Sequence, residues 1–429
     1  MTELIFPSLA QEGELDARDA LGLGPLPTMT PAFDVSGDVS EAALATAFAT
    51  VVRRHAPLRS VLLESELQAD PAEPSWQVRV DRPESAFVDY WSTADEKEFR
   101  HALSVSRIGI QSPIAATVLN AHRQPARLVL TIDHLAFDGV SLVLLTDEMN
   151  QILDNLRAGS APDAGLPVIE QHYYALAQSE RAAIEPTLAE CLPYWRDALA
   201  DSGAYPPVEL PGLDPEPADQ PLPRAQQHVS FDGLAPFLGF CQARQATPFV
   251  VFQAALAAAI SRLGGRYTGA NSKAAYRTDP RSWHLIGYFS NLITFAPAPP
   301  EDPADPLGWI ATLRRTAIEA VGQSLVPRAT LLRRLYPDSY PARPEAPHLN
   351  FELDSVPPSG STRPALTLLP PLAGQSMKAH AGLECTAVLL PDCGVLRVAY
   401  QEGACTPAAV DALLEMWLDI VVNEMAERQ

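Results

Sequence analysis

Residues 131–141 read TIDHLAFDGVS and carry the side chains in this chain that are best suited to acid–base chemistry. His134 ends an apolar run and precedes an Asp-Gly pair, where a buried strand would stop and a loop would lead into a helix. Such strand ends are where α/β proteins place reactive groups. Because a free imidazole has a pKa of about 6.5, His134 is a candidate general base for an incoming nucleophile.

No second catalytic group accompanies this histidine in the sequence. There is no GxSxG elbow, no HExxH or Cys/His cluster, and no glycine-rich loop with phosphate-binding spacing. If His134 is catalytic, it therefore acts as the single general base, without a metal. The alternative is a histidine held for structural reasons, which is our interpretation of His101, His122, His228 and His380. Asp138 is interpreted as structural, since a buried carboxylate needs a partner, usually an arginine.

The elements that would position His134 follow from apolar spacing. SGDVSEAALATAFATVVRRH is typical of an amphipathic helix capped by Ser40, and residues 127–133 are typical of a buried strand. After Gly139, apolar residues at 3-4 spacing predict a helix with Ser141 as its cap and Gly159 after its end.

Both halves of the chain mix helices with strands, which predicts an α/β fold. The remaining predicted elements are strands at LRSVLLE, SWQVRV, HLIGYFSNLITF (with a break at Gly287) and PHLNFEL, a hairpin at LECTAVLLPDCGVLRVAY, and helices ending near YWRDAL, from Thr247 to Gly264, and from Thr406 to about Met425. Residues 160–167 are small, polar and proline-containing, which suits a domain boundary. We therefore expect an N-terminal subdomain of residues 1–165 and a C-terminal subdomain of residues 166–429.

Composition excludes several classes of function. The chain has 429 residues, 47% of them apolar, and a net charge of −21, which argues against nucleic acid or an anionic membrane as a partner. No basic and apolar leader opens the chain, and no apolar run is long enough to span a bilayer. Five cysteines without a C-x-x-C pair suggest buried, reduced thiols in a cytoplasmic protein.

Several motifs, in order along the chain, resemble the condensation-domain superfamily of nonribosomal peptide synthetases. DHLAFDG resembles the family signature HHxxxDG, with Asp133 in place of the first histidine. SLAQEGEL at Ser8–Leu15 resembles the opening SxAQ motif, and RRHAPLRSVL from Arg53 resembles RHxxLR. PYWRDALAD followed by VELP resembles the YW…L…LP stretch. IGYFSNLITF from Ile286 resembles IGxFVNTLxxR, although Phe295 stands where the family often has arginine.

The resemblance implies two chloramphenicol-acetyltransferase-like α/β subdomains in a V, with the active site in a tunnel between them. The functional second histidine of the motif maps to His134, and the motif aspartate, Asp138, would be held by an arginine. Arg277 is the first candidate for that arginine and Arg59 the second. Gly139 is expected where the backbone must bend without a Cβ.

Three further residues are assigned to the tunnel through the resemblance: Ser141, Gly287 and Asn291. For Asn291, an equally acceptable interpretation is a loop asparagine that satisfies nearby backbone groups.

The resemblance also implies a reaction, the transfer of an acyl or aminoacyl thioester to an amine or a hydroxyl. Donor and acceptor would come on phosphopantetheine arms of acyl or peptidyl carrier proteins, or as a small free acceptor, with no cofactor bound by the enzyme itself. We expect a freestanding, monomeric condensation enzyme. The alternatives are an acyl-CoA-dependent acyltransferase of the same superfamily and a non-catalytic recruitment platform.

The role of Asp133 remains open between two hypotheses. If the strand stays extended through His134, Asp133 faces the packed side of its subdomain and supports the loop, paired with His55, Arg53, Arg54 or a backbone amide. Alternatively, Asp133 bends round to hydrogen-bond His134 and favours the charged imidazolium.

Overall fold

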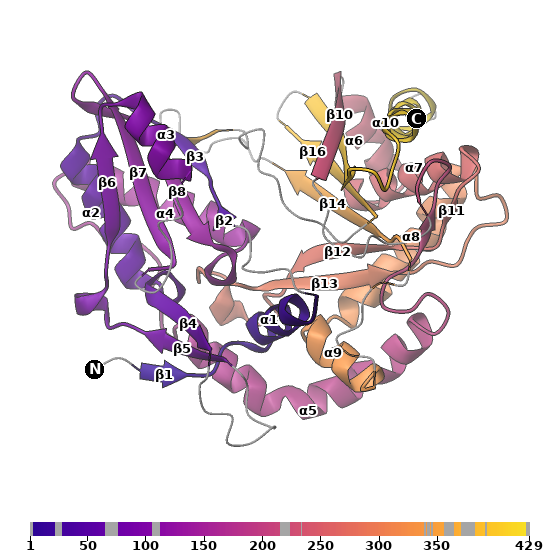
Figure 1. Cartoon of the computed structure of the whole chain (residues 1–429), viewed down its shortest axis with the longest axis horizontal. Helices are drawn as coiled ribbons and strands as arrows, with labels where there is room; N and C mark the ends of the chain where they lie inside the picture. The colour runs from indigo at the N-terminus through magenta and orange to yellow at the C-terminus, as the bar shows by residue number, and fades with distance from the viewer. Residues whose placement is uncertain are drawn as a thin grey trace. The chain divides into compact units, whose positions relative to one another are not determined.

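The structure, a computed structural model, describes residues 3–21, 28–64, 76–104, 112–214, 224–232, 234–338, 340, 344, 346–355, 364–369, 382–390 and 393–425. The chain forms two compact units, each with a mixed β-sheet and helices (Figure 1). The first unit comprises Met1–Glu185, Ala275–Ser290 and Ser359–Gln375, and the second comprises Pro186–Ala274, Asn291–Pro358 and Ser376–Gln429. The predicted α/β class is confirmed, whereas the subdomain boundary after residue 165 stays a prediction.

Within its described residues, the first unit contains a small antiparallel sheet, a larger mixed sheet and five helices, the last of which continues into the second unit. The small sheet has the order β1-β5-β4, and the larger one has the order β15-β3-β8-β7-β6 with β2 also paired to β8. Its elements are β1 (Glu3–Ile5), α1 (Leu9–Leu21), β2 (Thr28–Met29), β3 (Ala32–Val35), α2 (Glu41–Arg54), β4 (Ser60–Glu64), β5 (Trp76–Val80), β6 (Asp89–Thr93), α3 (Glu96–Ser104), β7 (Ile114–Ala121), β8 (Gln124–Asp133), α4 (Gly139–Arg157), α5 (Tyr173–Ala198) and β15 (Leu366–Leu368), with 3₁₀ turns η1 (Ala56–Arg59), η2 (Pro83–Ser85), η3 (His134–Ala136) and η4 (Pro280–Ser282).

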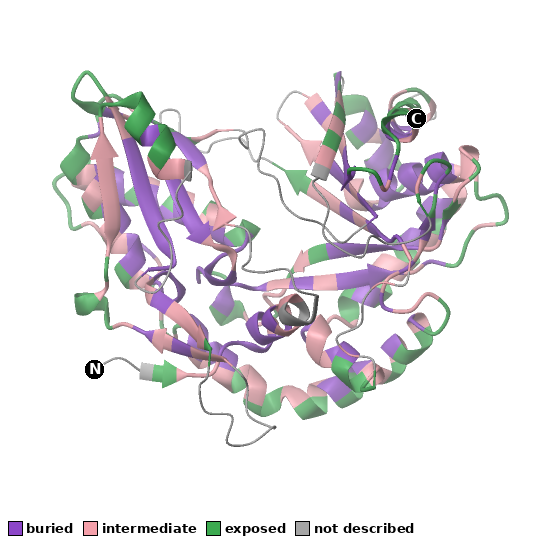
Figure 2. Cartoon of the chain, in the orientation of Figure 1, coloured by how far each residue is buried: buried purple, intermediate pink, exposed green. Residues whose placement is uncertain are grey.

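The larger sheet of the first unit carries helices on both faces (Figure 1). In β8, Leu128, Leu130 and Ile132 pack with α2 and α4, while Val129 packs with Phe99 of α3 on the opposite face. Figure 2 shows β7 and β8 as largely buried strands. Both faces of β8 are covered, which explains its run of branched apolar residues. Because the strand is held on both faces, the positions of Asp133 at its end and of His134 directly after it are fixed.

The helices beside this sheet begin where capping residues occur. Ser40 caps α2 through the Ala43 amide, as predicted. For α4 the prediction of Ser141 as cap is wrong. Asp138 is the cap, and its carboxylate accepts a hydrogen bond from the Ser141 amide, because the aspartate lies three residues earlier, where the chain is still extended. Gly159, with φ of 68°, follows the end of α4.

Residues 284–295 form a strand only in their second part. The predicted strand is confirmed for β13 (Ser290–Phe295), but residues 284–289 are irregular. Most of the backbone hydrogen bonds of residues 285–289 are made with side chains from other parts of the first unit, as described below. The prediction of a continuous strand with one break at Gly287 is therefore corrected.

The second unit has a six-stranded mixed sheet with the order β10-β17-β16-β14-β12-β13. Its elements are β9 (Val208–Glu209), β10 (Arg224–Asp232), α6 (Leu234–Ala243), α7 (Pro248–Arg262), β11 (Arg266–Tyr267), β12 (Ala270–Ala275), β13, α8 (Pro306–Gly322), α9 (Arg328–Leu335), β14 (Leu349–Ser355), β16 (Leu383–Leu389), β17 (Cys393–Gln401), α10 (Pro407–Asp419) and a π-helical turn η5 (Ile420–Glu424). The predicted hairpin is present as the antiparallel pair β16 and β17.

Helix α7 forms the centre of the second unit's core. Thr247 caps it and Pro248 opens it, as predicted, and Figure 2 shows it buried along most of its length. Every residue from Val250 to Ile260 is buried and all of them except Gln253 are apolar, so the helix packs on several sides. In the part of the chain that the structure describes, no helix is long and apolar enough to cross a membrane.

Candidate functional site

His134 begins the 3₁₀ turn η3, directly after the last residue of β8. Its Nδ1 lies 2.9 Å from the carbonyl oxygen of Phe137. Since a carbonyl oxygen can only accept, the neutral ring carries its proton on Nδ1 and its lone pair on Nε2. Among the residues that the structure describes, Nε2 has no hydrogen-bond partner, which leaves it available to take a proton.

Tyr288 packs against the imidazole of His134. The two rings meet edge to face, with centroids 5.7 Å apart and an interplanar angle of 79°. Burial raises the pKa of the Tyr288 hydroxyl well above its usual value, with a further contribution from the Glu14 carboxylate, so this hydroxyl stays protonated. The ring of His134 is therefore held from one side by a tyrosine and at Nδ1 by its own loop.

Asp133 caps the turn that carries His134. Its Oδ1 accepts a hydrogen bond of 2.9 Å from the Leu135 amide, one of the partners that the sequence suggested. The strand does not stay extended through His134, so the expected alternation of side chains ends at Asp133. Burial raises the pKa of Asp133, while the Leu135 amide, His134 and Arg18 act in the opposite direction.

Asp138 forms a buried ion pair with Arg277. The Arg277 Nη2 lies 3.1 Å from the Asp138 Oδ1, and the two side chains are only 7% and 3% exposed. Arg277 also donates to the carbonyl oxygens of Ser282 and Leu285 and lies over the Phe289 ring, 4.2 Å from its centroid. Burial lowers the pKa of Arg277, while Asp138 opposes that change, and the guanidinium remains charged.

Residues 285–289 have their backbone groups bonded to side chains from four other segments of the first unit. The contacts are Arg277 to the Leu285 oxygen (2.7 Å), the Ile286 amide to His55 Nδ1 (3.3 Å), the Gly287 amide and oxygen to Ser141 Oγ (3.0 and 2.9 Å), Tyr173 to the Tyr288 oxygen (2.8 Å), and the Phe289 amide to Asp138 Oδ2 (3.0 Å). These bonds replace a strand ladder and fix the backbone on either side of Tyr288.

His55 is oriented by a second buried pair. Its Nδ1 accepts from the Ile286 amide, so its Nε2 carries the proton and donates to the Glu148 carboxylate at 3.0 Å. Arg54 pairs with the same carboxylate at 3.2 Å. Although burial opposes it, the bonds from His55 and Arg54 lower the pKa of Glu148. His55 and Arg54 are therefore bound to Glu148 and do not serve Asp133.

Gly139 does not have the conformational role that the sequence suggested. It lies in the first turn of α4, its φ is outside the left-handed region, and an added Cβ would meet no atom within 4 Å. The prediction that Gly139 lies where the backbone must bend without a Cβ is therefore wrong. The residue is exposed, and a side chain there would enter open space beside the cap Asp138.

Gly287 and Ser141 are packed inside the first unit. A Cβ on Gly287 would lie 2.4 Å from the Tyr173 ring, so only glycine fits. Ser141 is fully buried, and its hydroxyl contacts Gly287 and, at 3.1 Å, Arg277. Their assignment to a substrate tunnel stays a prediction, and their observed contacts are structural.

Arg59 and Asn291 lie apart from these contacts. Arg59 donates to the backbone oxygens of Arg53 and Asp81, so Arg277 and not Arg59 holds Asp138. Asn291 belongs to the second unit, where its amide nitrogen donates to the Val326 oxygen at 3.1 Å. Its Oδ1 accepts from the Leu292 and Arg328 amides. These bonds match the interpretation of Asn291 as a residue that satisfies nearby backbone groups.

Gln11 lies in the SLAQEGEL motif and has no predicted role at the site, but it contacts the turn that carries His134. Ser8 and Gln11 form a capping box at the start of α1: the Gln11 amide donates to Ser8 Oγ and the Ser8 amide to Gln11 Oε1. The Gln11 Nε2 then donates to the Leu135 oxygen at 2.7 Å. The S-x-x-Q spacing signals the cap, but nothing in the sequence shows its contact with the His134 turn.

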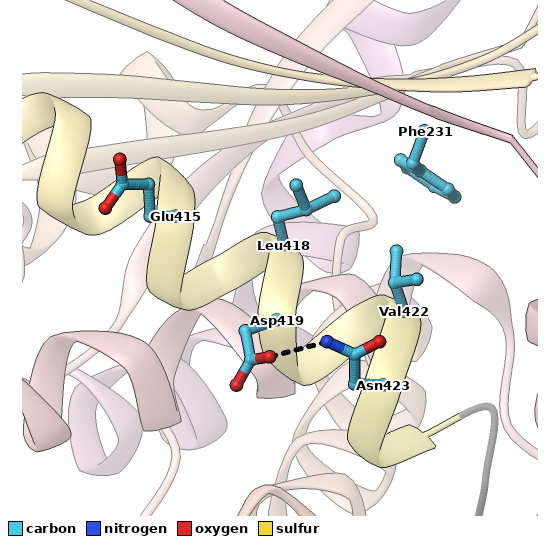
Figure 3. A pocket seen from close by; sticks show the side chains of 6 residues that line it. All are labelled: Phe231, Glu415, Leu418, Asp419, Val422 and Asn423. Atoms are coloured by element: carbon cyan, nitrogen blue, oxygen red, sulfur yellow. Dashed lines mark hydrogen bonds between the residues drawn. The ribbon is translucent and has the colours of Figure 1, made fainter.

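A separate hollow of about 310 Å³ lies in the second unit (Figure 3). It is lined by Phe231, Glu415, Leu418, Asp419, Val422 and Asn423. The Asn423 amide donates to the Asp419 carboxylate at 2.7 Å, as the dashed line shows. None of the residues assigned to the site lines this hollow, so it gives no argument about the chemistry of His134.

The comparison with protein families matches residues 26–338 to the Condensation domain. The chain therefore belongs to the condensation-domain family, whose members catalyse amide- or ester-bond formation in nonribosomal peptide biosynthesis. The resemblance found in the sequence is confirmed.

A curated relative is the probable non-canonical nonribosomal peptide synthetase CymA of Salinispora arenicola (strain CNS-205). It is 27% identical over 329 residues, which are 73% of this chain and 4% of that protein. The chain thus spans only a small part of this relative.

Solved structures of similar fold include the condensation domain of the monacolin K polyketide synthase MokA, with a TM-score of 0.75, 18% identity and coverage of 98% of this chain and 96% of that one. The epimerization domain from the third module of tyrocidine synthetase B has a TM-score of 0.76, 14% identity and coverage of 100% and 98%. These identities are low, so the two structures support the fold alone.

Asp138→Asn keeps the shape of the side chain and leaves Arg277 without its buried counter-charge. Breaking such a pair costs about 3–5 kcal/mol, so we expect urea unfolding to show a loss of about 3 kcal/mol. The matched control is Asp154→Asn, which breaks a 2.7 Å pair with Arg157 at the exposed end of α4 and should cost less than about 1 kcal/mol. Equal losses in the two variants would contradict the assigned role of the Asp138–Arg277 pair.

Asp133→Asn tests the burial of the Asp133 carboxyl. Because its folded pKa is raised above the ordinary value of 3.8, the folded state holds the proton to higher pH than the unfolded state. This group therefore lowers stability progressively as the pH rises from 3.8 through the folded pKa, and the full loss persists at higher pH. Asparagine keeps the Oδ1 cap and removes the effect, so the variant should gain stability relative to the parent as the pH rises above 3.8. Parallel stability curves from urea unfolding would contradict this account.

Proposed function

We propose that the protein transfers an acyl or aminoacyl group from the phosphopantetheine thioester of a carrier protein to an amine or hydroxyl nucleophile, with His134 as the general base. The observation that carries the proposal is the geometry of the imidazole. Nδ1 is engaged by the Phe137 carbonyl, so the lone pair is on Nε2 in the neutral ring. Family membership supports the reaction class.

The proposed step balances without a cofactor held by the protein. The nucleophile attacks the thioester carbonyl and forms the new C–N or C–O bond, while its proton passes to Nε2 of His134. Collapse of the tetrahedral intermediate breaks the C–S bond, and the proton on Nε2 goes to the departing sulfur as the free thiol forms. One histidine thus acts first as base and then as acid.

The contacts around His134 support this role because the imidazole must keep one tautomer and one orientation through both proton transfers. The Phe137 carbonyl stabilises the Nδ1–H form, and the positive charge that develops on the ring remains hydrogen-bonded at Nδ1. Tyr288, held at its own carbonyl by Tyr173, restricts the tilt of the ring.

A carrier protein is acidic and requires a local basic surface on this acidic chain. The sequence offers RRHAPLR and LLRRLY as candidates. In the first, Arg54 is paired with Glu148 and Arg59 donates to backbone oxygens inside the first unit. Arg53 of the first stretch and Arg333 and Arg334 on α9 in the second are exposed. Both stretches are therefore candidates for contact with a carrier.

The test is intact-mass analysis of acyl-loaded carrier proteins incubated with the enzyme and a panel of amines and alcohols. We expect loss of the acyl group from the carrier with the parent, and a rate lowered by about 10²–10⁴-fold with His134→Ala. The control is His228→Ala on β10, an exposed histidine of the second unit, which should leave the rate unchanged. A His134→Ala variant that keeps more than about a tenth of the parent rate would contradict the general-base role.

Two alternatives give different results in the same assay. An acyltransferase that uses acyl-CoA would turn over the same acyl group on CoA and not on the carrier. A recruitment platform would transfer nothing from either donor and would retain its binding to a partner after His134→Ala.

A further inference from the structure

The hollow of about 310 Å³ in the second unit has an apolar lining on two sides. Phe231, near the end of β10, lines one side, and Leu418 and Val422 line the other from α10 and η5. In Figure 3 both aliphatic side chains project from the helix toward the side on which Phe231 lies. Leu418 and Val422 are only partly buried, so they leave apolar surface accessible in the hollow.

Both sides of the hollow are preformed. Phe231 is opposite Gly394 of β17 in the antiparallel register, and a Cβ on Gly394 would lie 2.2 Å from the Phe231 ring. The ring therefore occupies the space that a side chain at position 394 would fill. On the other side, the α-helix changes at Ile420 to a π-helical turn, which Ile420 and Val421 anchor in the core. Such turns are rare and are frequently found at functional sites.

An acidic stripe borders the hollow. It consists of Asp411, Glu415 and Asp419, which are exposed and follow one another at intervals of four residues along α10. This spacing places them on one side of the helix, about 6 Å apart along its axis. Like charges in this spacing repel one another, and α10 has no basic residue in its last turn to offset them. The stripe therefore disfavours the helix that carries it, and a cationic partner would relieve the repulsion.

The arginine that acts on this stripe is engaged elsewhere. Arg262 interacts electrostatically with Asp419, but its Nη2 lies 3.0 Å from Glu424 Oε2 and its Nε donates to the Ala304 oxygen at 3.0 Å. Asp419 accepts its hydrogen bond from the amide of Asn423, which is uncharged. In the part of the chain that the structure describes, Glu415 has no ion pair. The stripe thus keeps negative charge available for a partner.

We propose that the hollow and the acidic stripe bind an amphipathic helix of a partner protein, which places one large apolar side chain in the hollow and basic side chains against the stripe. A helix that lies along α10 repeats its own side chains every four residues at the same spacing of about 6 Å. Its lysines or arginines would therefore meet the three carboxylates in turn, while its anchor residue contacts Leu418, Val422 and Phe231.

The charge of this surface also says which partner it rejects. An acidic carrier protein would be repelled by the stripe, so this surface differs from the two basic stretches that are candidates for carrier contact. The inference does not depend on the proposed reaction, because none of its residues contacts His134 and its test requires no turnover.

The test uses fluorescence anisotropy to measure binding of a labelled synthetic helix to the full chain. The helix has about 16 residues, with lysine at every fourth position and one phenylalanine beside that row. We expect a micromolar dissociation constant that rises with added salt. Peptides with glutamate in place of lysine, or serine in place of phenylalanine, should bind at least about tenfold more weakly.

Two variants of the protein separate the charges from the apolar lining. Glu415→Gln combined with Asp419→Asn removes two charges at constant shape and should weaken binding about five- to tenfold. Leu418→Ala removes apolar contact and should weaken it about fivefold or more. If Leu418→Ala does not fold, Val422→Thr, which keeps the side-chain shape and adds a hydroxyl, should weaken it about threefold or more.

The controls make matched changes on other surfaces of the same unit. Glu301→Gln combined with Glu319→Gln alters the net charge equally at two exposed positions. Ile318→Ala removes an apolar side chain that is 70% exposed on α8. Both controls should bind the peptide within about twofold of the parent.

Three results would overturn the proposal. The parent binds none of the peptides, or the control variants lose as much affinity as those at the hollow. The third is self-association of the parent, measured by sedimentation velocity, that Leu418→Ala abolishes, since the hollow would then be occupied by a second copy of the chain.

Discussion

The arrangement of the candidate site depends on one buried charge, the carboxylate of Asp138. Removing a carboxylate from water is costly unless donors surround it, and Asp138 accepts from the amides of Ser141 and Phe289 and from Arg277. The first bond starts α4, the second fixes the residue after Tyr288, and the third joins the segment that follows β12. A single side chain thereby ties together three segments that lie up to 151 residues apart along the chain.

The motifs of this chain also contact one another through Ile286 and Gly287. The glycine at 287 is needed because the Tyr173 ring occupies the space that a Cβ would take, and Ser141 then reaches both backbone groups of that glycine. The preceding residue, Ile286, donates its backbone amide to His55. These residues do not contact the imidazole directly, but they hold Tyr288 against it. The proposed reactive group is thus a single histidine on a short turn, and much of the surrounding polar network serves to keep that turn and Tyr288 in place.

Many of the helices and strands could be predicted from the sequence, because helix caps and runs of apolar residues are local features. Ser40 and Thr247 mark helix starts through their own side chains, and β8 is evident from its branched apolar residues. The pairing of Asp138 with Arg277 was reached through the family resemblance, and the structure contains it. The irregular backbone of residues 284–289 could not be predicted, because an apolar run indicates a strand and the partners that prevent one are distant in sequence. The contact of α1 with the His134 turn is likewise a matter of tertiary structure, although the S-x-x-Q cap was visible.

The central claim is that His134 presents an unprotonated Nε2 because its Nδ1–H is bound by the Phe137 carbonyl. The most direct measurement is the tautomeric state of His134, from nitrogen chemical shifts in protein labelled at histidine with ¹⁵N, assigned by the signals that disappear in the His134→Ala variant. The account predicts that the neutral ring carries its proton on Nδ1. A neutral ring with its proton on Nε2 would contradict the account, since that nitrogen could then not accept a proton from a nucleophile.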